Sequence, residues 1–162
     1  MNIVLNGAAG ELARVAVLAL PAVLEFPELR QSEDYREDVH RVVTSLSEFD
    51  RFEIVTTIDQ RVVGGAVIVL DDDQHVGPCL SLQWAYVLPE YRNASLGRAY
   101  ISELLRQASW AGIKNVCYTH RIGVGRYTLT YREVRHGKED KRTRRQGQEV
   151  YGEVGPAGCG YA

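Results

Sequence analysis

The sequence predicts an α/β protein, built as a central mixed sheet with helices on both faces. Residues 80–121 show a strand, a loop, a helix and a second strand in succession, which is the pattern of a right-handed crossover between two parallel strands. Residues 52–70 hold two β-rich runs separated by two turn residues, the pattern of an antiparallel hairpin. The length of 162 residues fits one domain, and a content of 45% hydrophobic and 25% charged residues is typical of a globular chain.

The N-terminal third predicts a short strand and two helices. Residues 2–5 read as the strand, and the apolar run 11–24 reads as a buried helix bent at Pro21. We do not interpret this run as a signal peptide, because no cleavage pattern follows it. Ser32 offers an oxygen to cap a second helix. His40 lies in that helix, and we expect it to be structural or exposed rather than catalytic.

The predicted hairpin consists of residues 52–58 and 61–70. A Gly-Gly pair at 64–65 interrupts its second run, which predicts a β-bulge or a close approach of another part of the chain. Three aspartates follow at 71–73. We interpret them as a solvated acidic loop, and a divalent-cation site is the alternative.

Residues 80–88 read as a central strand, because neither of its faces carries charge. Strict alternation places Leu80, Leu82, Trp84, Tyr86 and Leu88 on the same face. Proline at position 89 ends the strand, and Ser95 offers an N-cap for a helix whose apolar residues recur at helical spacing through residue 111. Glycine at 112 is typical of a helix C-terminus.

The loop between this strand and this helix, residues 89–99, predicts an anion site. Unpaired backbone N–H groups and the helix dipole attract negative charge at a helix N-terminus. Arg92 and Arg98 add positive charge, and Gly97 lets the backbone approach a ligand closely. The expected ligand is a phosphate or pyrophosphate.

The run VLPEYRNASLGRA, within residues 87–99, resembles the coenzyme A loop of the GCN5-related N-acetyltransferases. Serine stands at 95, where the first glycine of that motif is usual, and the resemblance extends over roughly residues 50–132. It implies that loop amides hold the pyrophosphate of acetyl-CoA, while the preceding strand edge holds its pantetheine and thioester. The cofactor-binding residues it implies are Val87, Leu88, Arg92, Asn93, Ala94, Ser95, Leu96, Gly97 and Arg98.

The resemblance also suggests catalytic groups. Strand amides near Tyr86 would polarise the thioester carbonyl, and Glu90 or Glu53 would accept the proton of the amine. In the family, a helix after the fifth strand carries a tyrosine that protonates the leaving thiolate. Here residues 122–125 are too few for that helix, and they predict a tight hairpin instead, so the fold is shortened after the fifth strand. Tyr118, His120 and Tyr127 are alternative acids, or ordinary strand residues, and Tyr118 is the one we select.

The chain divides into a domain at 1–135 and a basic, glycine-rich tail at 136–162. Residues 132–145 contain seven basic and three acidic residues, a net charge of +4 that leaves −6 for the rest of a chain of net charge −2. We expect the tail to dock on a protein partner or a second copy, with Tyr151 and Tyr161 as anchors. Nucleic-acid binding is disfavoured, because the basic part lacks interleaved aromatic residues.

The three cysteines are odd in number and lack metal-ligand spacing, so we predict no metal. This cysteine usage favours the cytoplasm, and no segment is long enough to span a membrane. Two functions are consistent with the sequence. One is an acetyl-CoA-dependent N-acyltransferase. The other is a non-catalytic structural or assembly protein that retains this fold, resembling components of bacteriophage particles, which would place it in a virus particle assembled in a bacterial cytoplasm.

Overall fold

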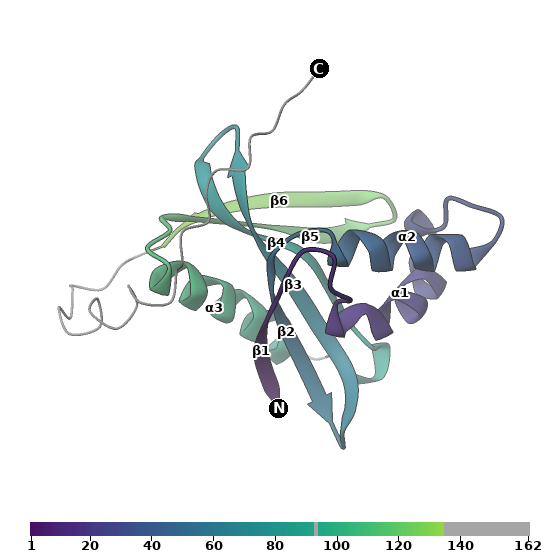
Figure 1. Ribbon diagram of the computed structural model, residues 1–162. Helices are drawn as coiled ribbons and strands as arrows, with labels where there is room; N and C mark the ends of the chain where they lie inside the picture. Colours follow the sequence, from purple (N-terminus) through teal and green to yellow (C-terminus); the bar gives the residue numbers. More distant parts are fainter. Residues whose placement is uncertain (93, 135–162) are drawn as a thin grey trace.

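Six strands form one sheet in chain order, with helices on both faces (Figure 1). The computed structural model describes residues 1–92 and 94–134. The strands are β1 (Asn2–Gly7), β2 (Arg51–Ile58), β3 (Arg61–Asp73), β4 (Gly77–Val87), β5 (Asn115–Gly123) and β6 (Arg126–Glu133). The helices are α1 (Ala19–Glu25), α2 (Tyr35–Ser47) and α3 (Ala94–Trp110), with 3₁₀ turns η1 (Arg14–Leu18), η2 (Pro27–Leu29) and η3 (Pro89–Tyr91).

The predicted mixed sheet is confirmed. Neighbouring strands pair antiparallel except β4 and β5, which are parallel and are joined by the crossover helix α3. After β5 the chain turns directly into β6, so the predicted shortening is also confirmed. The predicted tail at 136–162 lies outside the described residues. None of the described helices combines the length and the hydrophobicity that crossing a bilayer requires.

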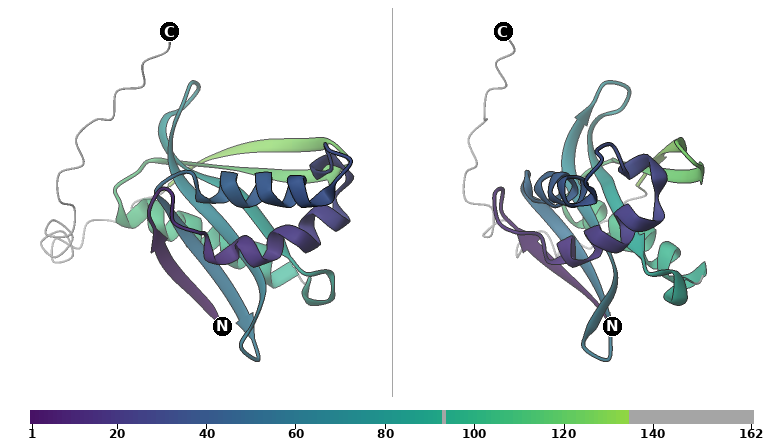
Figure 2. Two further views of the ribbon diagram at one scale, coloured as in Figure 1. Left: turned by 45° about the vertical axis from the view of Figure 1, so that its right-hand side comes forward. Right: turned by 90° about the vertical axis from the view of Figure 1, so that its right-hand side faces the viewer.

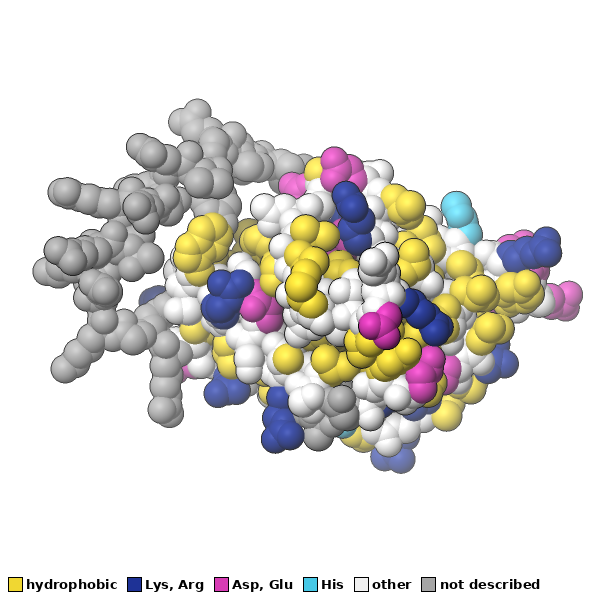
Figure 3. Space-filling view, turned by 90° about the horizontal axis from the view of Figure 1, so that it is seen from below, with side chains coloured by type: hydrophobic (Ala, Val, Ile, Leu, Met, Phe, Trp, Pro, Cys, Tyr) yellow, Lys and Arg dark blue, Asp and Glu magenta, His cyan; other side chains and the backbone are white. Residues whose placement is uncertain are grey.

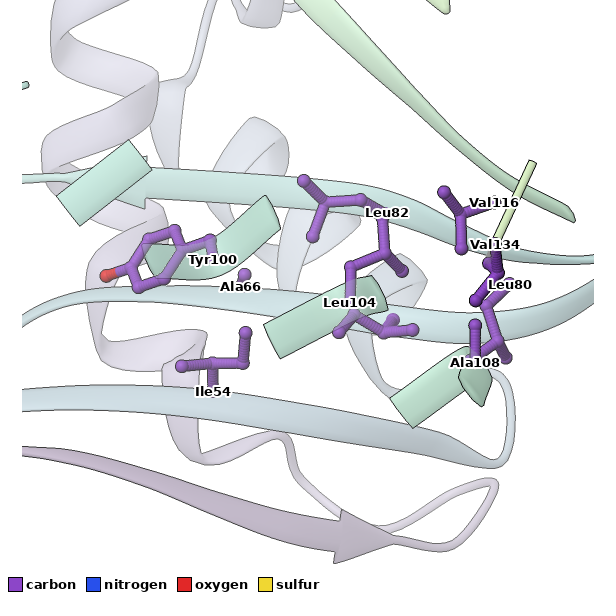
Figure 4. Close-up of a cluster of buried hydrophobic side chains, with 10 residues drawn as sticks. Ile54, Ala66, Leu80, Leu82, Tyr100, Leu104, Ala108, Val116 and Val134 are labelled. Carbon is purple, nitrogen blue, oxygen red and sulfur yellow. The ribbon is translucent and has the colours of Figure 1, made fainter. Parts of the chain in front are cut away.

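Helices lie on both sides of the sheet (Figure 2), and buried side chains form a layer on each of its faces. On one face, α3 packs Tyr100, Leu104 and Ala108 against Leu80 and Val116 of the sheet (Figure 4). On the other face, η1, α1 and α2 cover the sheet with a second set of buried side chains: Val15, Leu18, Ala19, Ala22, Val23, Val42 and Leu46. Both faces are therefore closed by apolar residues, as the uncharged central strand predicted.

A β-bulge in β4 contradicts the prediction of strict alternation. Trp84 pairs with Val67 and Leu82 pairs with Ile68, so Gln83 is an extra residue without an opposite partner in β3. Leu82 consequently packs on the α3 face, whereas Trp84 and Tyr86 pack on the α1 face. The bulge therefore directs the side chains of Trp84 and Tyr86, in the last part of β4, to the α1 face of the sheet.

Three local predictions need correction. The first helix is divided into η1 and α1, and Pro21 lies in the first turn of α1, where proline is tolerated, rather than at a bend. Asp34, not Ser32, caps α2 by accepting a hydrogen bond of 2.8 Å from the Arg36 N–H. Because α3 begins at Ala94, Ser95 lies inside its first turn and is not the N-cap.

The aspartates at 71–73 continue β3 and do not form a loop. Asp73 is anchored, because its carboxylate accepts hydrogen bonds from the backbone of His75 at 2.7 Å and from the Tyr131 hydroxyl at 2.9 Å. Among the described residues there is no group of His, Cys, Asp or Glu side chains arranged to hold a metal ion.

The Gly-Gly pair permits two close approaches, as predicted. A Cβ on Gly64 would lie 2.7 Å from the Tyr100 hydroxyl, which bonds Thr56 at 2.7 Å. A Cβ on Gly65 would lie 2.4 Å from Val15 Cγ1 and 2.8 Å from the Ile54 carbonyl oxygen. The register also shifts between Thr56 and the next residue of β2, opposite this pair.

We therefore expect Gly65→Ala to lower the free energy of unfolding by about 1–3 kcal/mol, the usual cost of overpacking a core. One obstructing atom belongs to the backbone and cannot rotate away. Urea unfolding measures the change. Gly97→Ala is the control, since a Cβ there meets no described atom outside its own helix backbone within 4 Å. Equal stability of the two variants would contradict the steric argument.

Candidate active site

The parallel strands β4 and β5 pair only over their first halves. The paired residues run from Cys79 and Asn115 to Leu82 and Tyr118, and beyond them both strands continue without pairing to each other. Diverging carboxyl ends of parallel strands are where open α/β sheets bind ligands. We call this opening the β4–β5 gap. Different side chains surround this gap on the face of the sheet covered by α1 and on the face covered by α3.

On the α1 face, one aromatic ring lies against two arginines from distant parts of the chain. The ring of Phe26, at the end of α1, lies 5.9 Å from the Arg92 guanidinium carbon and 4.7 Å from that of Arg121. It also meets the Tyr86 ring edge-on at 5.7 Å. The Phe26 cluster consists of Glu25, Phe26, Glu28, Tyr86, Arg92, Arg121 and Tyr127.

Glu25 and Arg92 form a bidentate ion pair in this cluster. Both Glu25 oxygens accept guanidinium N–H bonds of 2.5 Å, and Oε2 also accepts the Tyr86 hydroxyl at 2.8 Å. Arg92 is further fixed by its Nε, which donates to the Val87 carbonyl at 2.9 Å. The hydrogen bonds from Arg92 lower the pKa of Glu25. Burial acts in the opposite direction but is the smaller effect. Burial, and next the hydrogen bond to Glu25, raise the pKa of Tyr86.

A second ion pair, between Glu28 and Arg121, lies on the other side of Phe26. Arg121 Nε donates to Glu28 at 2.5 Å and the Tyr127 hydroxyl donates at 3.0 Å. Chiefly because of the Arg121 bond, the pKa of Glu28 is lowered to about 2. Since this pKa lies below that of an unfolded carboxyl, the stabilisation is present above roughly pH 4.3 and is lost as the pH falls toward 2.

On the α3 face, Tyr118 packs half-buried against the core cluster of α3. Tyr86 is buried on the opposite face, so the structure does not bring these two predicted catalytic residues together. Glu90 lies exposed in η3, where its carboxylate is 4.0 Å from Arg61. With Arg92, Glu90 lines a hollow of about 510 Å³ whose remaining lining residues are Met1, Asn2, Thr56, Ile58, Tyr91 and Leu96.

Glu53 is a structural residue and not a free proton acceptor. It is buried in β2, its Oε1 accepts a bond of 3.0 Å from Arg51, and its Oε2 accepts the Val15 N–H at 3.1 Å. Elsewhere, charges of both signs are interspersed with hydrophobic side chains, as on the face that contains the N-terminus and the β2–β3 turn (Figure 3). The described charges on that face do not gather into a field of one sign.

The backbone of the predicted cofactor loop is partly engaged. The N–H of Leu88 donates to Val63 at 2.9 Å, and the N–H of Arg92 donates to Pro89 at 3.2 Å. The first bond continues the pairing of β3 with the end of β4, and the second closes the η3 turn, so both amides already have partners. Ala94 to Arg98 form the first turns of α3, and Gly97 faces open space. Asn93 lies outside the described residues.

Sequence reasoning missed Glu25, Phe26 and Glu28. No local motif singles them out, because their partners Arg92 and Arg121 lie 67 and 93 positions away. The usable signal was weaker: two carboxylates flank the Phe-Pro pair that ends an apolar helix. Arg121 ends the predicted strand–helix–strand run at 80–121, and no sequence pattern gives it a further role.

The comparisons identify the family. The model of the Acetyltransferase (GNAT) family matches residues 20–125, and the chain belongs to this family. No curated protein matches it in sequence. Among solved structures, a predicted acetyltransferase from Clostridium acetobutylicum, solved with acetyl-CoA, is 12% identical with a TM-score of 0.52 over 75% of this chain and 82% of its own.

A ribosomal-protein-alanine N-acetyltransferase from Brucella melitensis biovar Abortus 2308 is also similar. It is 12% identical, with a TM-score of 0.51 over 100% of this chain and 97% of its own. At these identities the likeness concerns the fold, which is that of GNAT acetyltransferases. The comparisons give no support to the resemblance to bacteriophage proteins.

Proposed function

We propose that this protein is an acetyl-CoA-dependent N-acyltransferase. The observation that carries the proposal is the β4–β5 gap, which opens beyond Leu82 and Tyr118 beside the N-terminus of α3. A parallel pair that separates next to a helix N-terminus offers an apolar slot and an anion site together. The solved relative that contains acetyl-CoA shares this fold.

The residues present fit such a ligand. Gly97 faces open space in the first turns of α3, so amides between positions 93 and 98 would be approachable by a pyrophosphate. Val87 ends β4 and Leu88 follows it, and both would line the slot. Arg92 and Arg98 would supply positive charge. Acetyl-CoA supplies the acyl thioester that an acceptor amine attacks.

The chain's own groups would assist in three ways. Backbone N–H groups of β4 near Tyr86 would polarise the acyl carbonyl. Glu90, which is exposed, would accept the amine proton through water. Tyr118, half-buried on the α3 face at the last paired position, would donate a proton to the sulfur that leaves.

Titration calorimetry of the full chain with coenzyme A and with acetyl-CoA tests the proposal. We expect saturable heat with both ligands and competition between them. Inorganic pyrophosphate should compete weakly, since it shares only the anion site. No heat and no competition at millimolar coenzyme A would remove the enzymatic function. Docking of residues 136–162 on a partner stays a prediction, because those residues lie outside the described part of the chain.

A further inference from the structure

The side chain of Arg92 is committed to Glu25, although it lies next to the expected phosphate site. It precedes the first residue of α3 by two positions. Yet its guanidinium points to the end of α1, where it binds both oxygens of Glu25. A carboxylate bound by two parallel N–H bonds has the geometry in which a guanidinium also binds a phosphate. Glu25 therefore occupies the two guanidinium nitrogens with which Arg92 would otherwise bind a phosphate.

We propose that Glu25 is a positioning residue that competes with the phosphates of the cofactor for Arg92, so that cofactor binding releases the Glu25 carboxylate into the β4–β5 gap. This inference rests on the proposed function. The proposed release of Glu25 when the cofactor phosphates bind depends on this chain's Glu25–Arg92 pair and does not follow from the family fold.

A phosphate can reach Arg92 and replace Glu25 as its partner, because the ion pair is partly exposed. The Arg92 side chain is 41% exposed and that of Glu25 is 28% exposed, so solvent and a ligand reach the ion pair. An ion pair with this exposure is worth at most about 1 kcal/mol, because water screens it. Several phosphate oxygens and the helix dipole would outweigh it.

Release would change the environment of Glu25. Arg92 is the main cause of its lowered pKa, whereas burial acts in the opposite direction. Tyr86 would remain as its hydrogen-bond donor, and Arg121 would remain as the nearby positive charge. Without Arg92, the carboxylate would be less compensated and more basic. It would then favour a protonated amine as the acceptor, and the cofactor would bind before that acceptor.

Glu28 offers a matched control for the experiment. Glu28 lies in η2, three residues after Glu25, and its carboxylate also binds an arginine that contacts Phe26. Its partner Arg121, however, lies in β5 and not beside α3. Glu25→Gln removes the negative charge while keeping an oxygen that accepts the Tyr86 hydroxyl. Glu28→Gln makes the same chemical change at a site without the proposed competition.

The test is the affinity for coenzyme A, measured by calorimetry on full-length wild type, Glu25→Gln and Glu28→Gln, each checked for an unchanged melting transition. We expect Glu25→Gln to bind up to about fivefold tighter than wild type, the factor that corresponds to losing a partly exposed ion pair worth at most about 1 kcal/mol, while Glu28→Gln binds as wild type does. Binding by Glu25→Gln alone would also support the proposal. Equal affinity of all three would overturn it and leave the proposed function intact, as would equal tightening in both variants.

Should Glu25→Gln unfold, Glu25→Ala provides the second variant, with the same expected tightening. Absence of binding to every variant would remove the proposed function and this inference with it. That result differs from equal binding, so the two failures are distinguishable.

Discussion

Replacing Arg51 by methionine is expected to lower the free energy of unfolding by about 3–5 kcal/mol, because it leaves the Glu53 carboxylate buried without its cationic partner. Arg51 is 5% exposed and Glu53 is 1% exposed. Arg51 also donates to the carbonyl oxygens of Ala8 at 2.9 Å and Glu11 at 2.8 Å. The substitution thus also removes two of the hydrogen bonds that hold the β1–η1 connection in place.

Urea unfolding of Arg51→Met measures this loss. The double variant Arg51→Met with Glu53→Leu should recover much of it, since a buried ion pair is often replaceable by apolar side chains of similar volume. Arg61→Met is the matched surface control. Arg61 is 64% exposed and lies 4.0 Å from Glu90, so its loss should cost less than about 1 kcal/mol. A similar cost for Arg51 and Arg61 would refute a buried structural role.

Local patterns in the sequence were sufficient for most of the fold. The hairpin of β2 and β3 could be predicted because its turn residues and its β-rich runs are adjacent in the chain. The end of α3 was likewise predictable. Gly112 adopts a φ of +71°, and the Ile113 N–H closes the helix on the Ala108 carbonyl at 2.8 Å.

The β4 bulge was not predictable from the chain, because a strand's alternation looks regular whether or not its neighbour has an extra residue. Gln83 is extra only relative to the register of β3. The same limit applies to Glu25, whose importance depends on Arg92 and Tyr86 reaching it from β4 and the turn after it. Partners that meet only after the sheet has formed leave no periodic signal in the sequence.

Combining Arg92→Glu with Gly97→Asp is expected to weaken coenzyme A binding by more than about a hundredfold. Like charges placed against a phosphate cost several kcal/mol. The first substitution reverses the charge beside the expected phosphate site. The second places a carboxylate in the first turns of α3, where a Cβ meets no described atom within 4 Å and the fold should be preserved.

Calorimetry with coenzyme A measures the effect, after the melting transition has shown that the double variant is folded. Arg106→Glu is the charge-reversal control. It lowers the net charge by two, as Arg92→Glu alone does, and Arg106 is an exposed residue of α3 that pairs with Glu103 rather than with any group near the gap. Gly97→Ala separates the loss of glycine from the added charge. If the folded double variant bound coenzyme A as tightly as Arg106→Glu, the pyrophosphate would not lie on residues 93–98, whatever the fold.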